Sequence, residues 1–281
     1  MNLLKIKLER KLTKINDEFQ GVMGLAVKDL ETGDEFTMHG DEVFPIASSI
    51  KIPILIEFFK RVEIGEIDPK SHLNLLESHK VGGSGVLKEL GSGTLTMSLL
   101  DYAILMITVS DNSATNIIID LVGIDNVNHT LSQLGLVNTK FERKMMNLEG
   151  LKSGKENVST PQEMLTLMES LHLNRGLSPW VCERTVEILK KPKEGMIEGV
   201  IRNAVPEDVK IADKSGWVEG ATCDVGIVFL PKRPYLVSIM TKHIPVADQK
   251  RLAAIEAMTK VTKLVYEYFS EMSLSTPYGR R

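Results

Sequence analysis

The chain has 281 residues, a formal net charge of −3 and a hydrophobic content of 43%, which is ordinary for a folded protein with a sizeable core. The slightly acidic balance argues against a nucleic-acid binder, which would usually carry a basic surplus. No apolar run approaches the ~20 residues that a bilayer-spanning helix needs. We therefore expect neither a nucleic-acid nor a membrane partner.

The two cysteines, Cys182 and Cys223, lie in no CxxC motif or Cys/His cluster. A disulfide framework and a structural zinc site are both unsupported, and reduced thiols are expected. The first ten residues place charge in every turn and lack the uninterrupted apolar core of a secretory signal. The chain as given is accordingly expected in the cytoplasm, with a secreted mature form as the alternative.

Hydrophobic periodicity predicts helices and strands in a grouped order. The chain starts as an amphipathic helix and a β-hairpin, continues as helices with glycine-rich breaks, and ends as three strands and a closing helix. The predicted helices span 2–20, 48 to about 65, 98–109, 112–122, a segment restarting at 160, and 247–269. The predicted strands span 22–30, 35–38, 209–212, 225–230 and 235–240. The aperiodic stretch 137–159 is predicted to be a long loop of the kind that often carries function.

Strands at both ends of the chain with helices between them predict an α+β fold. We expect an antiparallel sheet flanked by the N- and C-terminal helices, with an inserted all-helical lobe. The sheet lobe would comprise residues 1–45 plus 205–281, and the helical lobe residues 46–204. A cleft between two such lobes is a common place for a functional site.

A polar pair, Ser48 and Lys51, opens a segment that is otherwise almost entirely apolar. At helical spacing, positions i and i+3 lie on one face about one turn apart. Burial disfavours the charged form of a lysine, and a neutral amine beside a serine hydroxyl is a general base beside a nucleophile. The alternative is structural, with Ser48 as a helix cap and Lys51 as a snorkelling surface lysine.

Two further polar clusters follow. Ser110-Asp111-Asn112 falls in the break between two apolar helices, and its alternative interpretation is a helix N-cap. Lys214-Ser215-Gly216 lies on the strand after 211–213, and its alternative is a strand-end turn. The three clusters in this order are much more specific than any one of them, because together they form the motif set of class A β-lactamases and penicillin-binding proteins.

On these motifs the sequence resembles the class A β-lactamase family of active-site serine hydrolases, and the resemblance covers nearly the whole chain. The flanking residues agree with the family too: Phe44-Pro45 before the serine, Val109 before the second motif, Ala114 and Asn116 after it, and Asp213 before the third. The resemblance implies a β-lactamase/transpeptidase-like fold in a single catalytic domain, 1–281. It also implies a small-molecule substrate and no metal or organic cofactor.

The resemblance assigns the acylation chemistry to four residues. Ser48 matches the nucleophile that attacks the lactam carbonyl, and Lys51 matches the lysine that accepts or relays its proton. Ser110 matches the hydroxyl that passes a proton to the departing ring nitrogen, which is a general-acid step. Lys214 matches the cation that faces the substrate carboxylate and tunes Ser110.

Four further residues match substrate-binding positions of the family. Asn112 matches the side-chain amide that holds both the lysine and the acylamide of the substrate. Ser215 and Gly216 match strand residues that line the acylamide. The backbone N–H groups of Ser48 and Trp217 would form the oxyanion hole, where two aimed donors stabilise the tetrahedral charge.

The sequence departs from the family in a loop after Arg143. In class A enzymes the residue two positions after this arginine is a glutamate that activates the water releasing the acyl group; here it is Met145. A thioether cannot take a proton from water at neutral pH, so slow deacylation is expected. Glu149, in the slot where the family has asparagine, is predicted either to act as a surrogate base or to be a solvated loop carboxylate.

A second departure concerns substrate capture. Family members often carry an arginine near the third motif that meets the β-lactam carboxylate, but residues 219–224 contain none. Trp217 is bulky and is expected to narrow the site. Cys223 is expected to be partly buried and inert, because nothing basic adjoins it to lower its pKa.

The sequence therefore predicts a serine hydrolase that forms an acyl-enzyme at Ser48 and hydrolyses β-lactam amides slowly, as a monomer or weak dimer. One alternative is an esterase or peptidase that processes small acyl compounds or peptidoglycan fragments. The other is an acylation sensor, in which the long-lived adduct is itself the signal.

Overall fold

The computed structural model describes residues 3–193, 199–245, 248–275 and 279. The chain divides into two compact units. The sheet unit comprises Met1–Ser49, Ser159–Glu169 and Glu198–Arg281, and the helical unit comprises Ile50–Val158 and Ser170–Ile197. Compared with the lobes expected from the sequence, the sheet unit additionally takes in 46–49, 159–169 and 198–204.

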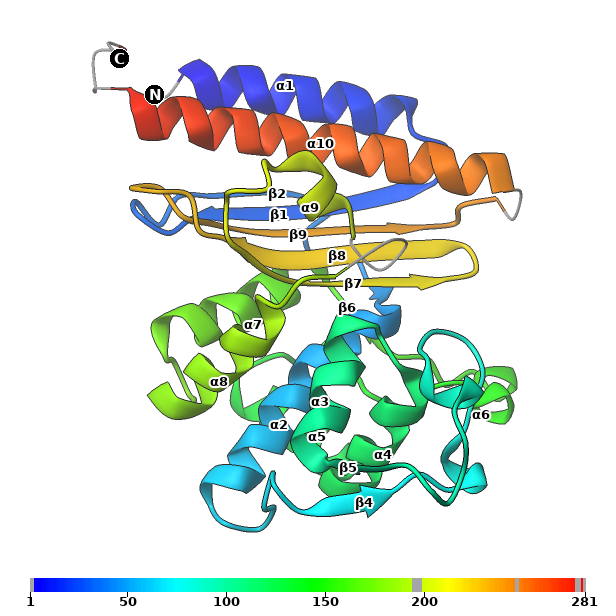
Figure 1. Ribbon diagram of the computed structural model, residues 1–281. Helices are drawn as coiled ribbons and strands as arrows, with labels where there is room; N and C mark the ends of the chain where they lie inside the picture. Colours follow the sequence, from blue (N-terminus) through cyan, green and yellow to red (C-terminus); the bar gives the residue numbers. More distant parts are fainter. Residues whose placement is uncertain (1–2, 194–198, 246–247, 276–278, 280–281) are drawn as a thin grey trace. The chain divides into compact units, whose positions relative to one another are not determined.

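The sheet unit is built on a five-stranded antiparallel sheet with the strand order β2-β1-β9-β8-β7 (Figure 1). The strands are β1 (Val22–Asp29), β2 (Glu35–Met38), β7 (Ile211–Val218), β8 (Ala221–Val228) and β9 (Tyr235–Lys242). An antiparallel sheet with flanking helices is the predicted fold class, which is confirmed. The strand order leaves β7 at one edge, where a strand has no partner on its outer side.

The β7–β8 hairpin corrects the sequence prediction at its turn. Val218 pairs with Ala221, so Glu219 and Gly220 alone form the connection, and Gly220 has a φ of +78°. Two-residue hairpin loops need such positive φ values, which glycine adopts without strain. Strand β7 carries the third motif, as expected, but continues to Val218, and β8 starts four residues earlier than predicted.

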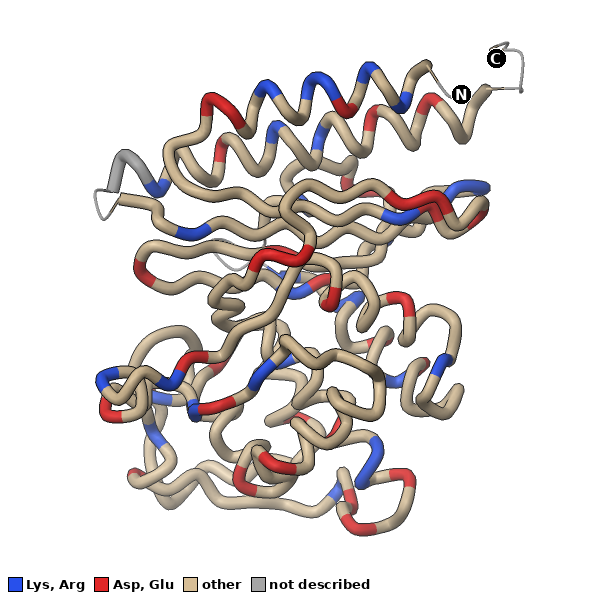
Figure 2. Tube along the Cα trace, turned by 180° about the vertical axis from the view of Figure 1, so that it is seen from behind, with Lys and Arg blue, Asp and Glu red and all other residues tan. Residues whose placement is uncertain are grey.

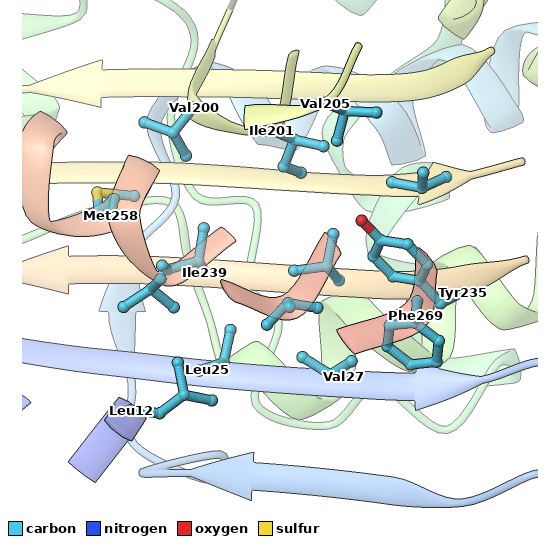
Figure 3. Close-up of a cluster of buried hydrophobic side chains, with 14 of the residues drawn as sticks. Leu12, Leu25, Val27, Val200, Ile201, Val205, Tyr235, Ile239, Met258 and Phe269 are labelled. Atoms are coloured by element: carbon cyan, nitrogen blue, oxygen red, sulfur yellow. The ribbon is translucent and has the colours of Figure 1, made fainter. Parts of the chain in front are cut away.

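Helices α1 (Leu3–Glu18), α9 (Gly199–Ala204) and α10 (Asp248–Leu274) pack with the sheet around one hydrophobic core (Figure 3). Side chains such as Leu12 of α1 and Met258 of α10 are fully buried there. At one end the Tyr235 and Phe269 rings stack with centroids 4.3 Å apart. Charges of both signs are interspersed along α1 and α10 (Figure 2), in keeping with the small net charge.

The helical unit surrounds α2 (Lys51–Glu63), whose first nine residues are all buried. A helix that is apolar on every side belongs inside a bundle. The other helices that lie wholly in this unit are α3 (Leu99–Thr108), α4 (Asn112–Val122), α5 (Ile124–Gln133), α6 (Leu148–Lys152) and α8 (Pro179–Leu189). Two short strands, β4 (His72–Asn74) and β5 (Thr96–Ser98), pair within a region predicted to be helical.

Three remaining elements lie near the unit boundaries: β3 (Phe44–Pro45), β6 (Val158–Ser159) and α7 (Pro161–Leu173). Helix α7 begins as predicted, because Pro161 occupies its first position and the Thr160 hydroxyl accepts a hydrogen bond from the Glu163 N–H at 3.1 Å. Within the described part of the chain, no helix is both long and apolar enough to cross a membrane.

Candidate active site

The nucleophile candidate Ser48 sits in a single 3₁₀ turn, Ala47–Ile50, that leads directly into α2. Ile50 occupies the N-cap position of α2 and makes no side-chain cap, so the alternative role of Ser48 as a helix cap is wrong. Ala47, immediately before it, has a φ of +43°. A non-glycine residue in this region costs free energy and is typical of functional turns. Ser48 is itself partly exposed, as a nucleophile must be.

Lys51, three residues later, is fully buried, which excludes the alternative of a snorkelling surface lysine. Its Nζ donates to the Ser110 carbonyl at 2.8 Å, to Ser110 Oγ at 3.0 Å and to Asn112 Oδ1 at 3.0 Å. The structure therefore brings Lys51 of the first motif together with Ser110 and Asn112 of the second motif within the helical unit. Of these three acceptors only the Ser110 hydroxyl can also donate, so it is the one through which a proton can pass.

The second motif forms the break between α3 and α4. Asp111 is the N-cap of α4, and its Oδ1 accepts from the Ala114 N–H at 2.9 Å, so the N-cap interpretation is correct for this residue. Its Oδ2 accepts from the N–H groups of Val86 and Leu87 at 2.7 and 2.8 Å. Ser110 has a φ of +51°, and this strained turn directs both its carbonyl and its hydroxyl to Lys51.

The glycine-rich loop before η3 (Leu87–Glu89) holds Asn112 from the other side. The Asn112 amide donates to the Gly82 carbonyl at 3.1 Å, and its backbone N–H donates to the Ser84 carbonyl at 3.0 Å. A Cβ on Gly83 would lie 2.5 Å from the Asn112 amide nitrogen. The loop therefore needs glycine where it touches the amide, and it fixes the side chain that accepts from Lys51.

The loop that carries Met145 is held through its main chain. Asn116 donates to the Met145 carbonyl at 3.1 Å and accepts from the Met145 N–H at 2.9 Å. In the same way, the Asn157 amide donates to the Arg143 carbonyl at 3.0 Å and accepts from the Arg143 N–H at 3.1 Å. Arg143 Nη2 donates to both carboxylate oxygens of Glu156 at 2.9 Å. The stretch predicted to be an aperiodic loop is thus an ordered frame that also contains α6.

The two loop residues singled out from the sequence have opposite environments. Met145 is buried, with 9% of its surface exposed. Glu149 is exposed in the first turn of α6, which favours the alternative of a solvated carboxylate over a surrogate base. Asn147 caps α6 by accepting from the Gly150 N–H at 2.9 Å.

In the sheet unit the third motif lies on the edge strand β7 and not in a turn. Lys214 is fully buried, and its Nζ donates to the Ser215 carbonyl at 2.6 Å. Ser215 is partly exposed, and Trp217 has 48% of its surface exposed. The outer side of an edge strand offers N–H and C=O groups to an extended ligand.

Gly216 lies against the turn that carries Ser48. A Cβ built on it would stand 2.8 Å from both the Ile46 carbonyl oxygen and the Ser48 nitrogen. Any side chain here would therefore separate the strand from the nucleophile turn. Within the sheet unit, this close approach places the backbone N–H of Ser48 beside the strand that bears Trp217.

Sequence reasoning missed several residues that build the site. The Arg251 guanidinium of α10 lies over the ring of Trp217, 4.1 Å from the ring centroid. Asn116 could have been found from the sequence, because it is one of the residues beside the second motif that agree with the family, although no contact with Met145 was predicted for it. Asn157 and Arg251 had no such signal, because only folding brings Asn157 to Arg143 and Arg251 to Trp217.

Among the described residues, no group of three or more His, Cys, Asp or Glu side chains is arranged to hold a metal ion. The sheet unit offers a serine, a buried lysine and backbone donors, and the helical unit offers a second buried lysine and a second serine. A partly exposed serine leading into a helix with a buried lysine, itself bonded to a serine–aspartate–asparagine turn, defines the class of active-site serine acyl-transfer proteins.

Comparison with known proteins places the chain within that class. The model of the β-lactamase enzyme family matches residues 7–269, so the chain belongs to this family, as the class A resemblance predicted. The β-lactamase CARB-4 of Pseudomonas aeruginosa is 26% identical over 278 residues, covering 95% of this chain and 92% of the relative.

Solved structures agree with the observed fold. A β-lactamase from Sphaerobacter thermophilus is 29% identical, with a TM-score of 0.82 over 94% of this chain and 97% of that one. A mutant of PBP-A in an acyl-enzyme complex with penicillin G is 27% identical, with the same TM-score and the same coverage of each chain. The predicted β-lactamase/transpeptidase-like architecture is confirmed.

Proposed function

We propose that the protein is a β-lactam-reactive serine hydrolase whose acyl-enzyme forms readily and hydrolyses slowly. The observation that carries this proposal is the environment of Lys51, a fully buried amine bonded to Ser110 and Asn112. Membership of the β-lactamase family and the acyl-enzyme seen for the PBP-A mutant support it.

In the proposed acylation Lys51 acts in its neutral form, in which a lone pair replaces one of the three donated hydrogen bonds. Ser48 Oγ attacks the lactam carbonyl carbon while its proton passes to that lone pair. The carbonyl oxygen becomes an oxyanion, which the N–H groups of Ser48 and Trp217 stabilise. When the C–N bond breaks, the Ser110 hydroxyl protonates the departing nitrogen and is itself reprotonated from Lys51. The products are an ester at Ser48 and a free amine on the opened ring.

The roles of the third motif follow from the edge strand. Lys214 would meet the carboxylate of the substrate, Ser215 and Gly216 would line its acylamide, and the backbone N–H of Trp217 would belong to the oxyanion hole. Arg251, stacked on Trp217, adds a second cation to this end of the strand. These assignments make a small anionic acyl compound the expected substrate.

Release of the acyl group requires a positioned water and a base. The slot that would hold the base carries Met145, which has no basic group, and Glu149 is exposed. General-base assistance contributes about 10²–10⁴-fold to such steps. We therefore assign the protein a turnover limited by deacylation, and the same property would serve an acylation sensor.

The test is covalent labelling with penicillin G followed by intact-mass spectrometry. The wild-type protein should gain one penicillin mass, and Ser48→Ala should gain none while keeping its circular dichroism spectrum. Ser132→Ala, which changes an exposed serine of α5, is the matched control and should label normally. An adduct that persists in Ser48→Ala would show that another residue is the nucleophile.

The same experiment separates the proposal from the esterase or peptidase alternative. An enzyme built for small esters or peptidoglycan fragments would turn over p-nitrophenyl esters and fail to label with penicillin. Labelling without measurable turnover would instead favour the sensor, for which the adduct is the end product.

A further inference from the structure

The nucleophile turn and the edge strand approach each other around a small buried polar cluster of the sheet unit. Cys223 of β8 pairs with Gly216 of β7 in the sheet register. Because Gly216 has no side chain, the Cys223 sulfur lies 2.9 Å from where its Cβ would be. The thiol thus occupies space next to the point where strand and turn come closest.

Cys223 and Ser49 contact carbonyl groups on both of these elements. The Cys223 thiol can donate to the Ile46 carbonyl at 3.0 Å and lies 3.6 Å from the Gly216 carbonyl. The Ser49 hydroxyl donates to the Lys214 carbonyl at 2.9 Å and lies 3.2 Å from the Cys223 sulfur. The turn and the strand are therefore joined by two side chains that touch each other.

Both side chains are fully buried. Burial also raises the pKa of the Cys223 thiol to about 12, so the thiol remains protonated at neutral pH and keeps its hydrogen for the Ile46 carbonyl. A protonated, inaccessible thiol is neither a nucleophile nor a metal ligand. Cys223 is therefore unreactive, as expected, but its position allows it to hold neighbouring backbone groups in place.

We propose that Ser49 and Cys223 are positioning residues of the oxyanion hole, holding the nucleophile turn against β7 so that the N–H groups of Ser48 and Trp217 converge on one point. This inference rests on the proposed function. Oxyanion donors must lie about 2.7–3.1 Å from the developing charge, and misplacement by about 1 Å can cost about 10²-fold in rate.

The experiment compares Cys223→Ala and Ser49→Ala with the wild-type protein in the rate of acylation by penicillin G. The second readout is the infrared stretching frequency of the ester carbonyl in the acyl-enzyme, which falls as the oxyanion hole polarises the carbonyl. We expect acylation to slow about tenfold or more and the ester frequency to rise. Cys223→Ser, which keeps a donor, should recover most of both.

The matched control is Cys182→Ala. Cys182 is also buried, but it lies on α8, and its sulfur is 3.8 Å from the carbonyl of Ser170, which belongs to none of the three motifs. This variant should lose stability through its cavity while its acylation rate and ester frequency stay at wild-type values. A merely structural role for Cys223 would make the two cysteine variants alike.

The positioning role is overturned if Cys223→Ala or Ser49→Ala, once folded, acylates at the wild-type rate with the wild-type ester frequency. If Cys223→Ala does not fold, Ser49→Ala and Cys223→Ser decide the question by the same readouts. A wild-type protein that forms no ester would refute the proposed function itself, which is a different result from an unchanged variant.

Discussion

The sharpest test of the missing base is to supply it by Met145→Glu. The loop main chain at this position is fixed by both hydrogen bonds of Asn116, and the bidentate pair of Arg143 with Glu156 holds the loop on the other side. None of these bonds involves the side chain at 145. The new carboxylate should therefore take the place of the thioether without rebuilding the loop.

Two opposing magnitudes follow. A general base contributes about 10²–10⁴-fold, which corresponds to about 3–5 kcal/mol of the deacylation barrier. Against this, Met145 is 9% exposed, and a carboxylate in a buried position loses hydration and side-chain packing, an effective penalty of several kcal/mol. We expect the Met145→Glu protein to deacylate faster and to be less stable. The two effects are separate, because the deacylation barrier depends on the acyl-enzyme and its transition state, whereas the unfolding free energy depends on the folded and unfolded states.

The assay is the lifetime of the penicillin adduct, followed by intact mass after excess penicillin is removed, together with steady-state turnover. The adduct of Met145→Glu should decay at least about 10²-fold faster while its rate of formation stays the same. Met146→Glu is the control: the neighbouring residue is 43% exposed, and a carboxylate there should leave the lifetime unchanged. Equal lifetimes in wild-type and folded Met145→Glu protein would refute the missing-base reasoning.

Three further predictions concern a close backbone contact, an exposed carboxylate and two buried thiols. Gly216→Ala should slow acylation by penicillin at least about tenfold and lower Tm, because its Cβ would stand 2.8 Å from two backbone atoms; a wild-type acylation rate would contradict the close approach. Glu149→Gln should leave adduct lifetime unchanged, since the carboxylate is exposed, whereas a tenfold longer lifetime would identify it as the base. Burial raises the pKa of the Cys182 thiol from 9.0 to about 11 and that of the Cys223 thiol from 9.0 to about 12. As pH rises, the unfolded state therefore releases these protons before the folded state does. The stability that the protonated thiols contribute is complete below pH 9 and is lost as pH rises from 9 toward 12. The unfolding free energy should fall by up to about 1.4 kcal/mol per pH unit for each thiol, between pH 9 and about 11 for Cys182 and between pH 9 and about 12 for Cys223. Denaturation of the two alanine variants between pH 8 and 11 should show a shallower fall.

The fold was largely predictable because its signals are local. The alternation in the hairpin, the amphipathic stripe of α1 and the closing helix α10 are periodic over many residues. The all-apolar run of α2 predicts burial for the same reason. The errors fall where tertiary pairing overrides local pattern: β4 and β5 pair across a long loop, and the Glu219-Gly220 turn was not recognised as a hairpin connection.

The site was predictable wherever a motif keeps its residues together in sequence. Lys51 and Asn112 were expected to meet, and the structure shows their hydrogen bond. The hydrogen bond between Lys51 and Ser110 was not predicted. Residues that act on the motifs from elsewhere were not predictable. The sequence predicts only an inert thiol at Cys223, because no basic residue adjoins it. Its place opposite Gly216 depends on the β7–β8 register.

The three strained turns have a consequence for the stability of the whole protein. Of the seven non-glycine residues with positive φ in the described part of the chain, Ala47, Ser110 and Met146 have values of +43°, +51° and +60° and lie next to Ser48, Asp111 and Met145. A left-handed conformation costs about 1–2 kcal/mol for a non-glycine residue, while a folded domain is stable by only about 5–15 kcal/mol. Selection for thermal stability alone would favour glycine or asparagine at these three positions. The backbone at these three turns therefore offsets part of the stability that the buried core provides.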